Sequence, residues 1–586
     1  MRVLLINPPV RDFFFTPQRA YPLGLLSLAT VLEQSGVAVR ILNMPAGGKA
    51  TTAGLPDDFR HLQRYYQENK SAFRLFSHYR HFGLPESSVD EHLRQFQPDM
   101  VGIAANFAAY LRETLAIAQR VKHCDARIPV VAGGRLATVL PETLLASSAI
   151  DFVLRGEAEY SLRDLCRVVA GKGSAERVAG LCDRRQGAQS RISRSIARID
   201  DLNNLPILNR GLIDCEEYNF QGMRSAALLA SRGCSLGCSF CAIRERFRFR
   251  RAAHVLAEIE DCYRRGIRHF NFEDDNMNLN PEFAALLSGI RERYSGTIRI
   301  SFMNGLLSRG ITAALRRLLL DAGLTHLDLS VGTVNSRMRA AVCRREQPRN
   351  VYRLAREFSS AGITTTVHFI LAMPGQSRAM ACAELRRLAA QPVLLGPSIF
   401  YPVPESPLFR KIRPFFPQWQ EQLPLFRSSV AVYEREIARD DIMTLFALSR
   451  LINFLKVSVG SEAGRDVHLR DYLARTLSAF AAAGNSMASV SSTNFEVLSL
   501  RLVYYAAVYG RLYRLLKQGG DSPGYVAVPE VFAAPTLVRR VLNRLIIRAP
   551  SGATLRLGVP GDYAQDPAEK DAVQSGRRVF LAARSG

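Results

Sequence analysis

Three cysteines near the middle of the chain have the residue type and spacing best suited to chemistry. Cys234, Cys238 and Cys241 form a C-x3-C-x2-C pattern, with Gly233 and Gly237 between or beside them. Thiolates are the usual protein ligands of a 4Fe-4S cluster, and three ligands leave one iron free to bind another molecule. The alternative is a structural zinc ion, but zinc sites usually pair two C-x2-C hairpins. The sequence has no second such hairpin.

The loop Ser231-Arg-Gly-Cys-Ser-Leu-Gly-Cys-Ser-Phe-Cys241 resembles the cluster-binding signature of radical S-adenosylmethionine (SAM) enzymes. The resemblance implies that the open iron chelates the amino and carboxylate groups of SAM. It also implies that one electron from the reduced cluster cleaves the sulfonium and gives a 5'-deoxyadenosyl radical. Phe240, the residue before the last cysteine, is a predicted SAM contact.

Further SAM contacts are predicted at the ends of later strands. Glu273, Asp274 and Asp275 follow a predicted strand, where carboxylates can accept hydrogen bonds from the α-ammonium group of SAM. The same residues can cap the following helix. The resemblance adds contacts to the methionyl and ribose groups at Ser301, Ser330 and His368.

One segment departs from the family pattern. Many relatives have Gly-x-Glu-Ser where this chain has Ser330-Val-Gly-Thr-Val-Asn335, so the acidic group is missing. The departure leaves open whether SAM or the substrate is held as in typical members. It also leaves open whether reductive cleavage to the radical is the step used.

The first 170 residues alternate strand and helix patterns, as a doubly wound parallel sheet does. The predicted strands cover 2–7, 37–42, 99–104, 129–134 and 150–159, with helices over 22–33 and up to about 123. Such sheets bind ligands at the carboxyl ends of their strands, where glycines let the backbone approach closely. The pattern alone fits a flavodoxin-like domain without a ligand equally well.

The order of Asn7-Pro-Pro, Pro22-Leu-Gly24, Gly133-Gly134 and Gly156-Glu-Ala-Glu159 resembles the cobalamin-binding domain of cobalamin-dependent radical SAM enzymes. The predicted cobalamin contacts are Pro8, Leu23, Gly24, Ala104, Asn106, Phe107, Gly133, Gly134, Gly156, Glu157 and Glu159.

The loop after the first strand lacks the D-x-H-x-x-G motif of better-known cobalamin domains. The segment Asn7-Pro-Pro-Val-Arg-Asp12 stands there, and the first histidine of the chain is His61. No histidine can therefore ligate cobalt from this loop. The resemblance implies for this subgroup that the dimethylbenzimidazole tail is displaced and that a nearby residue or water occupies the lower cobalt face. Asn106, Phe107 and Tyr110 are predicted to lie near that face, although each can be a plain packing or capping residue.

The rest of the chain divides into a linker, a second α/β domain and a helical region. Residues 171–224 are rich in Gly, Ser, Arg and Pro and predict a linker. Residues 225–430 contain six predicted strands, too few for an eight-stranded barrel, which agrees with the partial βα barrel that the resemblance implies. The strands cover 226–230, 267–276, 298–303, 326–331, 364–371 and 394–403.

Residues 431–562 predict a mostly helical domain, interpreted as a substrate-facing cap, and residues 563–586 a flexible tail. Helical spacing recurs over 436–456, 466–483 and 494–518. Residues 535–548 would form a helix with leucine, valine and isoleucine on one face and four arginines on the other. A packed helix with a basic outer face is the leading interpretation, and a helix on an anionic membrane surface is the alternative.

Composition excludes several classes of protein. The 586 residues include 77 Lys and Arg against 53 Asp and Glu, a net charge of +24, and ten mostly scattered cysteines. Scattered thiols fit a reducing cytoplasm. No apolar run approaches the about 18 residues needed to span a bilayer. The amino terminus does not resemble a signal peptide. The arginines are spread along the chain, which gives no strong signal for nucleic acid. They are equally compatible with an acidic reductase such as flavodoxin or ferredoxin.

The five arginines that follow the cysteine loop have two interpretations, an anionic-ligand or reductase contact and a solvated turn. They are Arg244, Arg246, Arg248, Arg250 and Arg251.

The sequence predicts an enzyme that uses a 4Fe-4S cluster, SAM and cobalamin to methylate an unactivated carbon of a small-molecule substrate. In that hypothesis methylcobalamin supplies the methyl group, and the adenosyl radical removes a hydrogen atom from the substrate carbon. A second hypothesis is oxidative cyclisation or ring rearrangement without methyl transfer. A third, of another class, is a noncatalytic iron-sulfur and cobalamin sensor that binds nucleic acid, although no recognition motif supports it.

Overall fold

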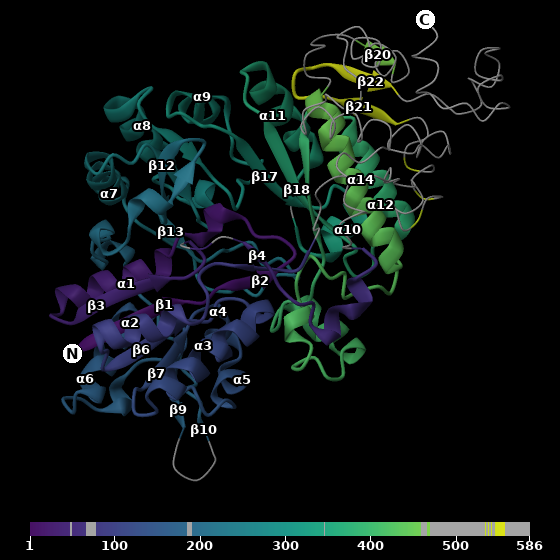
Figure 1. The fold of residues 1–586 in the computed structure, drawn as a ribbon. Coiled ribbons are helices and arrows are strands. Elements are labelled where there is room, and N and C mark those ends of the chain that lie inside the picture. Colours follow the sequence, from purple (N-terminus) through teal and green to yellow (C-terminus); the bar gives the residue numbers. More distant parts are fainter. Residues whose placement is uncertain are drawn as a thin grey trace, which may run out of the picture.

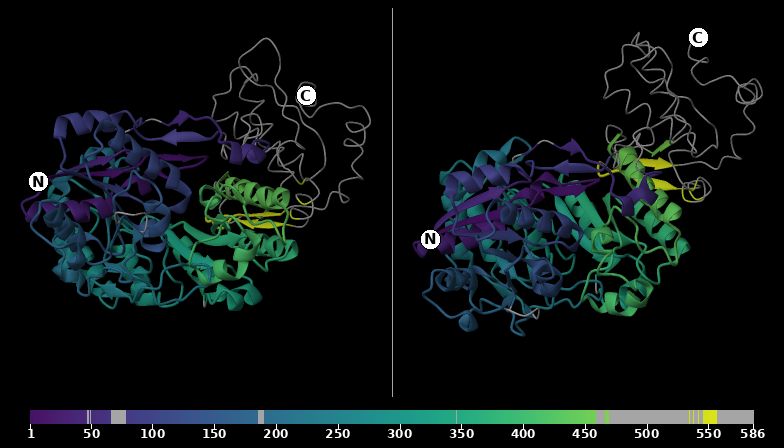
Figure 2. Two further views of the ribbon diagram at one scale, coloured as in Figure 1. Left: turned by 90° about the horizontal axis from the view of Figure 1, so that it is seen from below. Right: turned by 60° about the horizontal axis from the view of Figure 1, so that its bottom comes forward.

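Two parallel sheets, each covered by helices, form most of the protein (Figure 1). The computed structural model describes residues 1–46, 48, 50–65, 78–184, 190–344, 346–458, 466–468, 534, 537, 541 and 545–556. Residues 469–483 of one predicted helix, the whole predicted helix over 494–518 and the tail 563–586 lie outside these residues. In the two further views of Figure 2, the first sheet lies alongside the second.

The first sheet is doubly wound, as the sequence predicted. Its parallel strands stand in the order β8-β7-β6-β1-β3. They are β1 (Arg2–Asn7), β3 (Ala38–Asn43), β6 (Met100–Ala104), β7 (Val130–Gly133) and β8 (Phe152–Leu154). Leu4 and Ile6 pack on one face with helices α2 (Ser88–Phe96) and α3 (Leu111–Cys124). Val3 and Leu5 pack on the other with α1 (Leu23–Gln34) and α6 (Glu159–Val169).

The segment predicted as a linker is more ordered than the sequence suggested. Strands β9 (Leu181–Arg184) and β10 (Ser190–Arg191) extend the first sheet as antiparallel edge strands beyond β8. Leu181 and Cys182 are buried, because they cover the edge of β8. Only the later part of 171–224 remains an extended connection, which includes three single-turn helices between Leu202 and Glu217.

The second sheet is a partial barrel of six parallel strands, which confirms the predicted architecture. Its strands are β12 (Met223–Leu228), β15 (His269–Phe272), β16 (Arg299–Ser301), β17 (Leu327–Gly332), β18 (Thr365–Leu371) and β19 (Leu394–Ile399). The strands form two hydrogen-bonded groups, β12-β15-β16 and β17-β18-β19. Two isolated parallel bridges, Ile300 with Leu324 and Leu306 with Leu329, link each group to the segment between β16 and β17. The helices that cover its outer face include α7 (Ala252–Arg264), α8 (Phe283–Tyr294), α9 (Ala313–Asp321), α11 (Pro348–Ser360) and α12 (Arg378–Ala389).

Side-chain alternation fixes the inner face of the barrel. Val367 and Phe369 are buried against the outer helices, whereas Thr366 and His368, which alternate with them along β18, are only partly buried. Successive side chains of a strand point to opposite faces, so Thr366 and His368 lie on the inner face.

The described part of the C-terminal region closes the open edge of the barrel. Helix α14 (Arg439–Ser458) packs beside α12 and β19 (Figure 1). The Asn453 amide donates to the Leu395 carbonyl and accepts from the Leu395 N–H, both at 2.7 Å, as a neighbouring strand would. Lys456 is fully buried and donates to the carbonyls of Leu388, Gln391 and Val393. Thus α14 is part of the barrel wall and not the cap that the sequence suggested.

Two predicted helices of this region begin or end as strands. Strands β20 (Asp466–His468), β21 (Ile546–Arg548) and β22 (Thr554–Arg556) pair into a small sheet. The helices predicted over 466–483 and 535–548 are therefore wrong at Asp466–His468 and at Ile546–Arg548. The β-branched Ile546 and Ile547 favour a strand once a partner strand is available.

Candidate functional site

The three predicted cluster cysteines lie on a loop between β13 (Ser231–Arg232) and β14 (Arg248–Phe249). Gly233 adopts φ +83°, and a Cβ there would stand 2.6 Å from the Arg246 carbonyl oxygen, so only glycine fits. The backbone of Ser239 donates to the Val342 carbonyl at 3.1 Å, and its carbonyl accepts from Leu408 at 2.8 Å. Backbone hydrogen bonds to the segments that follow β17 and β19 therefore hold the loop in place.

Each of the three cysteine sulfurs accepts a hydrogen bond from a surrounding N–H group. The Asn276 side chain donates to Cys234 at 2.9 Å, and the backbone N–H of Ile243 donates to Cys241 at 3.4 Å. The Arg344 guanidinium donates to Cys238 at 3.5 Å. Such donors stabilise thiolates that carry a metal, and outer contacts of this kind orient the ligands of metal sites.

This donor set fits a cluster better than a single metal ion. All three cysteines are free thiols. In the described part of the chain, no three His, Cys, Asp or Glu side chains converge closely enough to hold one ion. Zinc needs its thiolates about 3.8 Å apart, as its bond length and tetrahedral geometry require, whereas each thiolate of a cube binds a different iron. Burial raises the pKa of Cys234 and Cys241, and iron binding would deprotonate them.

The three consecutive acidic residues after β15 have different surroundings. Asp274 is 2% exposed and accepts hydrogen bonds from the Ala230 N–H at 3.2 Å and from the Ser231 hydroxyl. Burial raises the pKa of Asp274 to about 6. Its carboxyl group anchors the start of the cysteine loop. Glu273 and Asp275 are less deeply buried, and their partial burial raises the pKa of both carboxyl groups. They are better placed than Asp274 for a ligand at the rim.

The other predicted SAM contacts lie on the inner face of the barrel. Ser301 is buried, donates to the Asn271 side chain at 3.0 Å and contacts His269 at 3.1 Å. His368 pairs with Asp328 at 2.7 Å across β17 and β18. His368 stands opposite Ser330 in the register of β17 and β18.

Phe240 belongs to the cysteine loop, and both Phe240 and Ser330 lie near the end of β17. The Phe240 ring comes within 3.6 Å of the Cβ position at Gly332, and the Ser330 carbonyl accepts a hydrogen bond from Arg344. The structure therefore brings Phe240, Ser330, Glu273 and Asp275 to the rim.

The predicted cobalamin glycines fall into two groups. A Cβ at Gly24 or Gly133 would meet no atom within 4 Å, so these two backbones are open to a ligand. A Cβ at Gly134 would stand 2.5 Å from the Asn106 side chain, and one at Gly156 would stand 2.2 Å from the Ala197 carbonyl. Gly134 and Gly156 are thus required by the protein's own packing.

The loop after β6 carries an exposed aromatic residue. Phe107 is 60% exposed, unusual for a large apolar side chain, and its ring meets Tyr110 edge-on at 5.8 Å. The Tyr110 hydroxyl donates to Asp12 at 3.0 Å, and Asp12 pairs with buried Arg427 at 3.2 Å. The open glycine at 133 and the exposed ring of Phe107 at one sheet edge fit the apolar face of a corrin.

The remaining predicted cobalamin contacts surround this edge. Ala104 ends β6, Leu23 begins α1, and Pro8 is buried in the loop after β1.

Glu157 and Glu159 join the first sheet to the cysteine loop. Glu157 pairs with Arg248 through both carboxylate oxygens at 2.7 and 2.8 Å. Buried Glu159 pairs with Arg232 at 2.6 Å and accepts from the Ser27 hydroxyl at 2.8 Å. Arg232 stands two residues before Cys234. The two glutamates therefore dock the sheet directly against the start of the loop.

The arginines after the cysteine loop divide between the two interpretations. Arg248 and Arg250 are buried in ion pairs with Glu157 and Glu258, so neither forms a solvated turn or a free anion-binding face. Arg244, Arg246 and Arg251 are exposed.

Comparison with known proteins identifies both domains. The sequence model of the Radical SAM superfamily matches residues 228–387, and that of the B12 binding domain matches residues 77–166. The chain joins a B12 binding domain to a radical SAM domain. The predicted cofactors, a 4Fe-4S cluster with SAM in one domain and cobalamin in the other, are those of these domain types.

Three curated relatives share part of this sequence. An uncharacterized methyltransferase of Pyrococcus horikoshii is 28% identical over 208 residues, 34% of this chain and 45% of its own length. Cytidylyl-2-hydroxyethylphosphonate methyltransferase of Streptomyces wedmorensis is 25% identical, over 48% of this chain and 56% of its own. Anaerobic magnesium-protoporphyrin IX monomethyl ester cyclase of Synechocystis is 25% identical, over 48% and 50%. The chain spans about half the length of these relatives.

Two solved structures share the fold. The radical SAM methyltransferase TsrM of Kitasatospora setae, with cobalamin and a 4Fe-4S cluster bound, superposes with a TM-score of 0.52 at 19% identity, over 70% of this chain and 77% of its own. The cobalamin-dependent radical SAM enzyme OxsB gives a TM-score of 0.57 at 13% identity, over 87% and 72%. At these identities the likeness concerns the fold alone.

Sequence reasoning missed the residues that support the loop. Arg344 lies 106 residues from Cys238, and Asn276 lies 42 residues from Cys234. Nothing in their local sequence distinguishes them from other arginines and asparagines. Glu157 and Glu159 were selected, but their two arginine partners could not be inferred without the domain arrangement.

Proposed function

We propose that this protein is a cobalamin-dependent radical SAM methyltransferase that acts on an unactivated carbon of a small-molecule substrate. The two domain matches, and two curated methyltransferases among the partial relatives, support the proposal. The structural likeness to TsrM and OxsB supports the domain arrangement that such a reaction needs.

The observation that carries the proposal is the contact between the two candidate cofactor sites. Arg232, at the start of the cysteine loop, pairs with Glu159, which begins α6 at the carboxyl edge of the first sheet. Arg135 of the first domain also pairs with Glu245, later in the same loop, at 2.5 Å. Methyl transfer through cobalamin needs both cofactors to reach one substrate carbon, so their sites must face each other.

The proposed mechanism assigns distinct tasks to the protein. Bound together, the cluster, SAM and cobalamin supply one-electron cleavage of a sulfonium and transfer of a methyl group. Cys234, Cys238 and Cys241 would hold the cluster. Glu273 and Asp275 present acceptors for the SAM ammonium group at the rim, and Phe107 offers an apolar surface to cobalamin. The barrel positions the reactants and excludes water.

The proposal is tested by anaerobic reconstitution with iron, sulfide and hydroxocobalamin, followed by incubation with dithionite as the reductant and SAM that carries an isotope-labelled methyl group. Mass analysis of adenosine-containing products separates 5'-deoxyadenosine from S-adenosylhomocysteine. We expect S-adenosylhomocysteine from loading of the methyl group, and labelled methyl in a product once a substrate is supplied. Turnover that consumes SAM and leaves the labelled methyl group only on methionine would exclude the methyltransferase.

Oxidative cyclisation is the second candidate, because one partial relative is a cyclase. A cyclase would produce 5'-deoxyadenosine and a product with two hydrogens fewer than the substrate. The labelled methyl group would stay on the sulfur of methionine and would not reach the product. The same labelled incubation therefore decides between the two activities.

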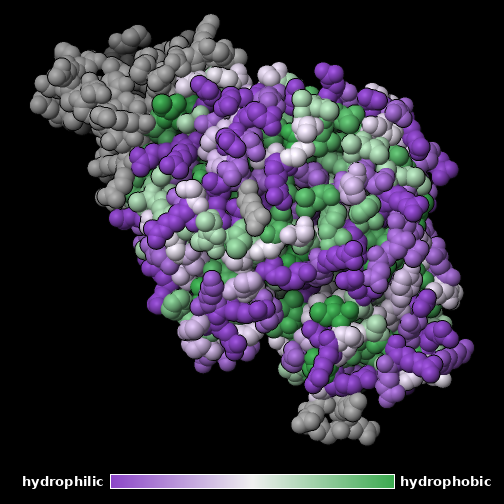
Figure 3. Space-filling view, turned by 180° about the vertical axis from the view of Figure 1, so that it is seen from behind, coloured by the Kyte–Doolittle hydropathy of each residue, from purple (hydrophilic) through white to green (hydrophobic). Residues whose placement is uncertain are grey.

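We further propose a cytoplasmic location and a low-potential reductase, flavodoxin or ferredoxin, as the electron donor. Scattered free thiols support the first and the net charge of +24 supports the second. In the part of the chain that the structure describes, no helix is long and apolar enough to cross a bilayer. On the face in Figure 3, hydrophobic side chains form small groups among hydrophilic ones.

A further inference from the structure

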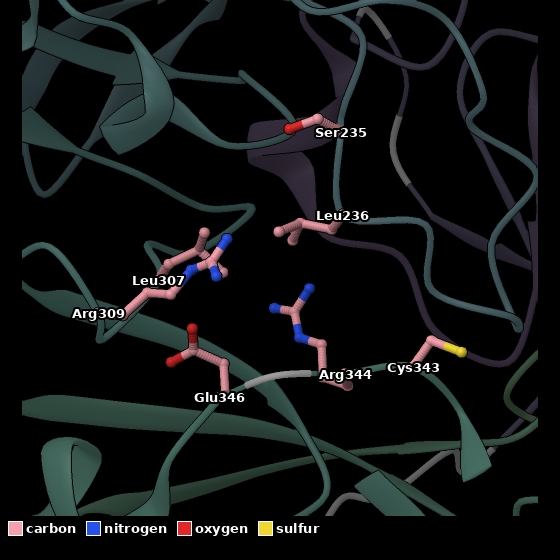
Figure 4. Close-up of a pocket in the computed structure, with 7 residues that line it drawn as sticks. All are labelled: Ser235, Leu236, Leu307, Arg309, Cys343, Arg344 and Glu346. Carbon is pink, nitrogen blue, oxygen red and sulfur yellow. The ribbon is translucent and has the colours of Figure 1, made fainter. Parts of the chain in front are cut away.

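A polar pocket lies directly beside the cysteine loop (Figure 4). It encloses about 510 Å³ of free space, part of it open to solvent, and is lined by Ser235, Leu236, Leu307, Arg309, Cys343, Arg344 and Glu346. Ser235 and Leu236 belong to the loop itself. In Figure 4 the Arg344 guanidinium points into the pocket toward Leu236, and the Cys343 thiol points away.

Arg344 joins this pocket to one of the cluster ligands. Its side chain is buried, with the residue 8% exposed, and one guanidinium N–H donates to the Cys238 sulfur at 3.5 Å. A second N–H donates to the Ser330 carbonyl, and this bond fixes the guanidinium on the end of β17. These two hydrogen bonds therefore fix the guanidinium of Arg344 beside the Cys238 sulfur.

The charge of Arg344 has no acidic partner among the described residues. Its Nε atom is buried without a hydrogen-bond acceptor, and neither of its other contacts is a carboxylate. Oε2 of the nearby Glu346 carboxylate accepts hydrogen bonds from the N–H and the hydroxyl of Ser308. An ordinary structural arginine at this depth pairs with Asp or Glu, as Arg210 pairs with Glu258 at 2.6 Å. The negative charge missing around Arg344 is the charge that a thiolate-ligated cluster supplies.

We propose that Arg344 is a positioning residue that raises the reduction potential of the cluster by holding a fixed positive charge on the Cys238 sulfur. The inference rests on the cluster of the proposed function. Reduction adds one electron to the cluster, and a nearby cation stabilises the more negative state. Hydrogen bonds to cluster sulfurs and local charge are recognised determinants of such potentials. The bond to Ser330 places the charge on the segment where the acidic residue of many relatives is missing.

The test compares the midpoint potential of the reconstituted cluster, without SAM, in the wild type and in Arg344→Met, Arg344→Gln and Arg344→Lys. The potential is followed by electron paramagnetic resonance during titration with dithionite. At a fixed applied potential, we expect at least a tenfold smaller ratio of reduced to oxidised cluster in the Met and Gln variants. That change corresponds to about 59 mV for one electron. Arg344→Lys keeps the charge and should retain most of the wild-type value.

Arg309→Gln is the matched control, because Arg309 lines the same pocket and no cysteine sulfur is among its contacts. It should leave the potential unchanged. Iron and sulfide content, measured for every variant, separates loss of the cluster from a changed potential. Equal potentials in wild type, Met and Gln variants would overturn the proposal, as would an equal shift in Arg344→Lys and Arg344→Gln. If Arg344→Met loses its cluster, the Gln and Lys pair decides, and a protein that binds no cluster at all refutes the proposed function instead.

Discussion

The two cofactor halves of the candidate site are built in different ways. In the radical SAM half, three cysteines within eight residues lie on one loop, and each sulfur receives one N–H donor. In the B12 half, the predicted contacts come from five separate segments, and the structure divides them by role. Gly133 and Phe107 are open, whereas Gly156, Glu157 and Glu159 are occupied by the protein itself.

The difference shows how a cluster site and a cobalamin site depend on the fold. Covalent ligands concentrate the cluster's binding energy in a few sulfur atoms, so a short motif suffices. Cobalamin without a histidine ligand is held by many weak contacts along a sheet edge, so its site depends on how the strands are arranged. The ion pairs of Glu157 and Glu159 connect the two sites and belong to both.

The largest expected effect concerns the cluster half. Cys238→Ala should abolish the visible absorption of the reconstituted cluster, because two thiolates cannot hold a cube firmly. Iron content and the absorption spectrum measure the loss. Cys343→Ala is the control, since this exposed thiol lines the adjoining pocket but is not a predicted ligand. A normal cluster spectrum in Cys238→Ala would refute the ligand assignment.

Breaking the connection between the halves should cost stability. Arg232→Met leaves Glu159, which is 4% exposed, without its cation, and loss of one partner of a buried ion pair costs about 3–5 kcal/mol. Urea unfolding at pH 7 measures the effect. Arg127→Met removes an exposed pair with Asp125 and should leave the midpoint unchanged. If the two variants unfold alike, the docking contact is not stabilising.

A buried histidine on the inner face of the barrel gives the stability of the protein a pH dependence at acidic pH. Burial lowers the pKa of His269 to about 4. The unfolded chain takes up a proton near pH 6.5 and the folded one does not, so stability should fall by about 3 kcal/mol as the pH drops from 6.5 to 4. Unfolding free energies of wild type and His269→Gln at pH 7 and 4.5 isolate this contribution. A wild type and variant with the same pH dependence would contradict it.

The smallest expected effect separates ligand contacts from packing within the B12 half. Gly134→Ala introduces a Cβ at φ +124° against Asn106 and Ala105 and should cost about 1–3 kcal/mol of stability. Gly133→Ala meets no atom within 4 Å and should leave stability unchanged while it weakens hydroxocobalamin binding. Thermal unfolding and a spectroscopic cobalamin titration measure both variants. Unchanged cobalamin affinity in Gly133→Ala would remove this glycine from the site.

Local patterns predicted the elements of both sheets, but not what covers their edges. The strand at 2–7 and the six barrel strands follow from short apolar runs after turns, which are local properties. The edge strand β9, in a segment rich in Gly, Ser and Arg, forms because β8 offers unpaired backbone groups. Likewise, Asn453 closes the edge of β19 from 58 residues away. Such pairing has no signature within the segment itself.

The sequence by itself determined the chemistry of this protein: the spacing of Cys234, Cys238 and Cys241 places three thiolates on one loop, because neighbours in the chain cannot lie far apart. Only the tertiary structure decided which side chains serve that loop. In the folded protein Arg344 donates a hydrogen bond to Cys238, and Asp274 accepts one from Ser231 at the start of the loop. Glu157 and Glu159 form ion pairs with Arg248 and Arg232. The first two contacts form within the second domain and the last two between the domains, and their distances are set by packing and not by the length of chain between them.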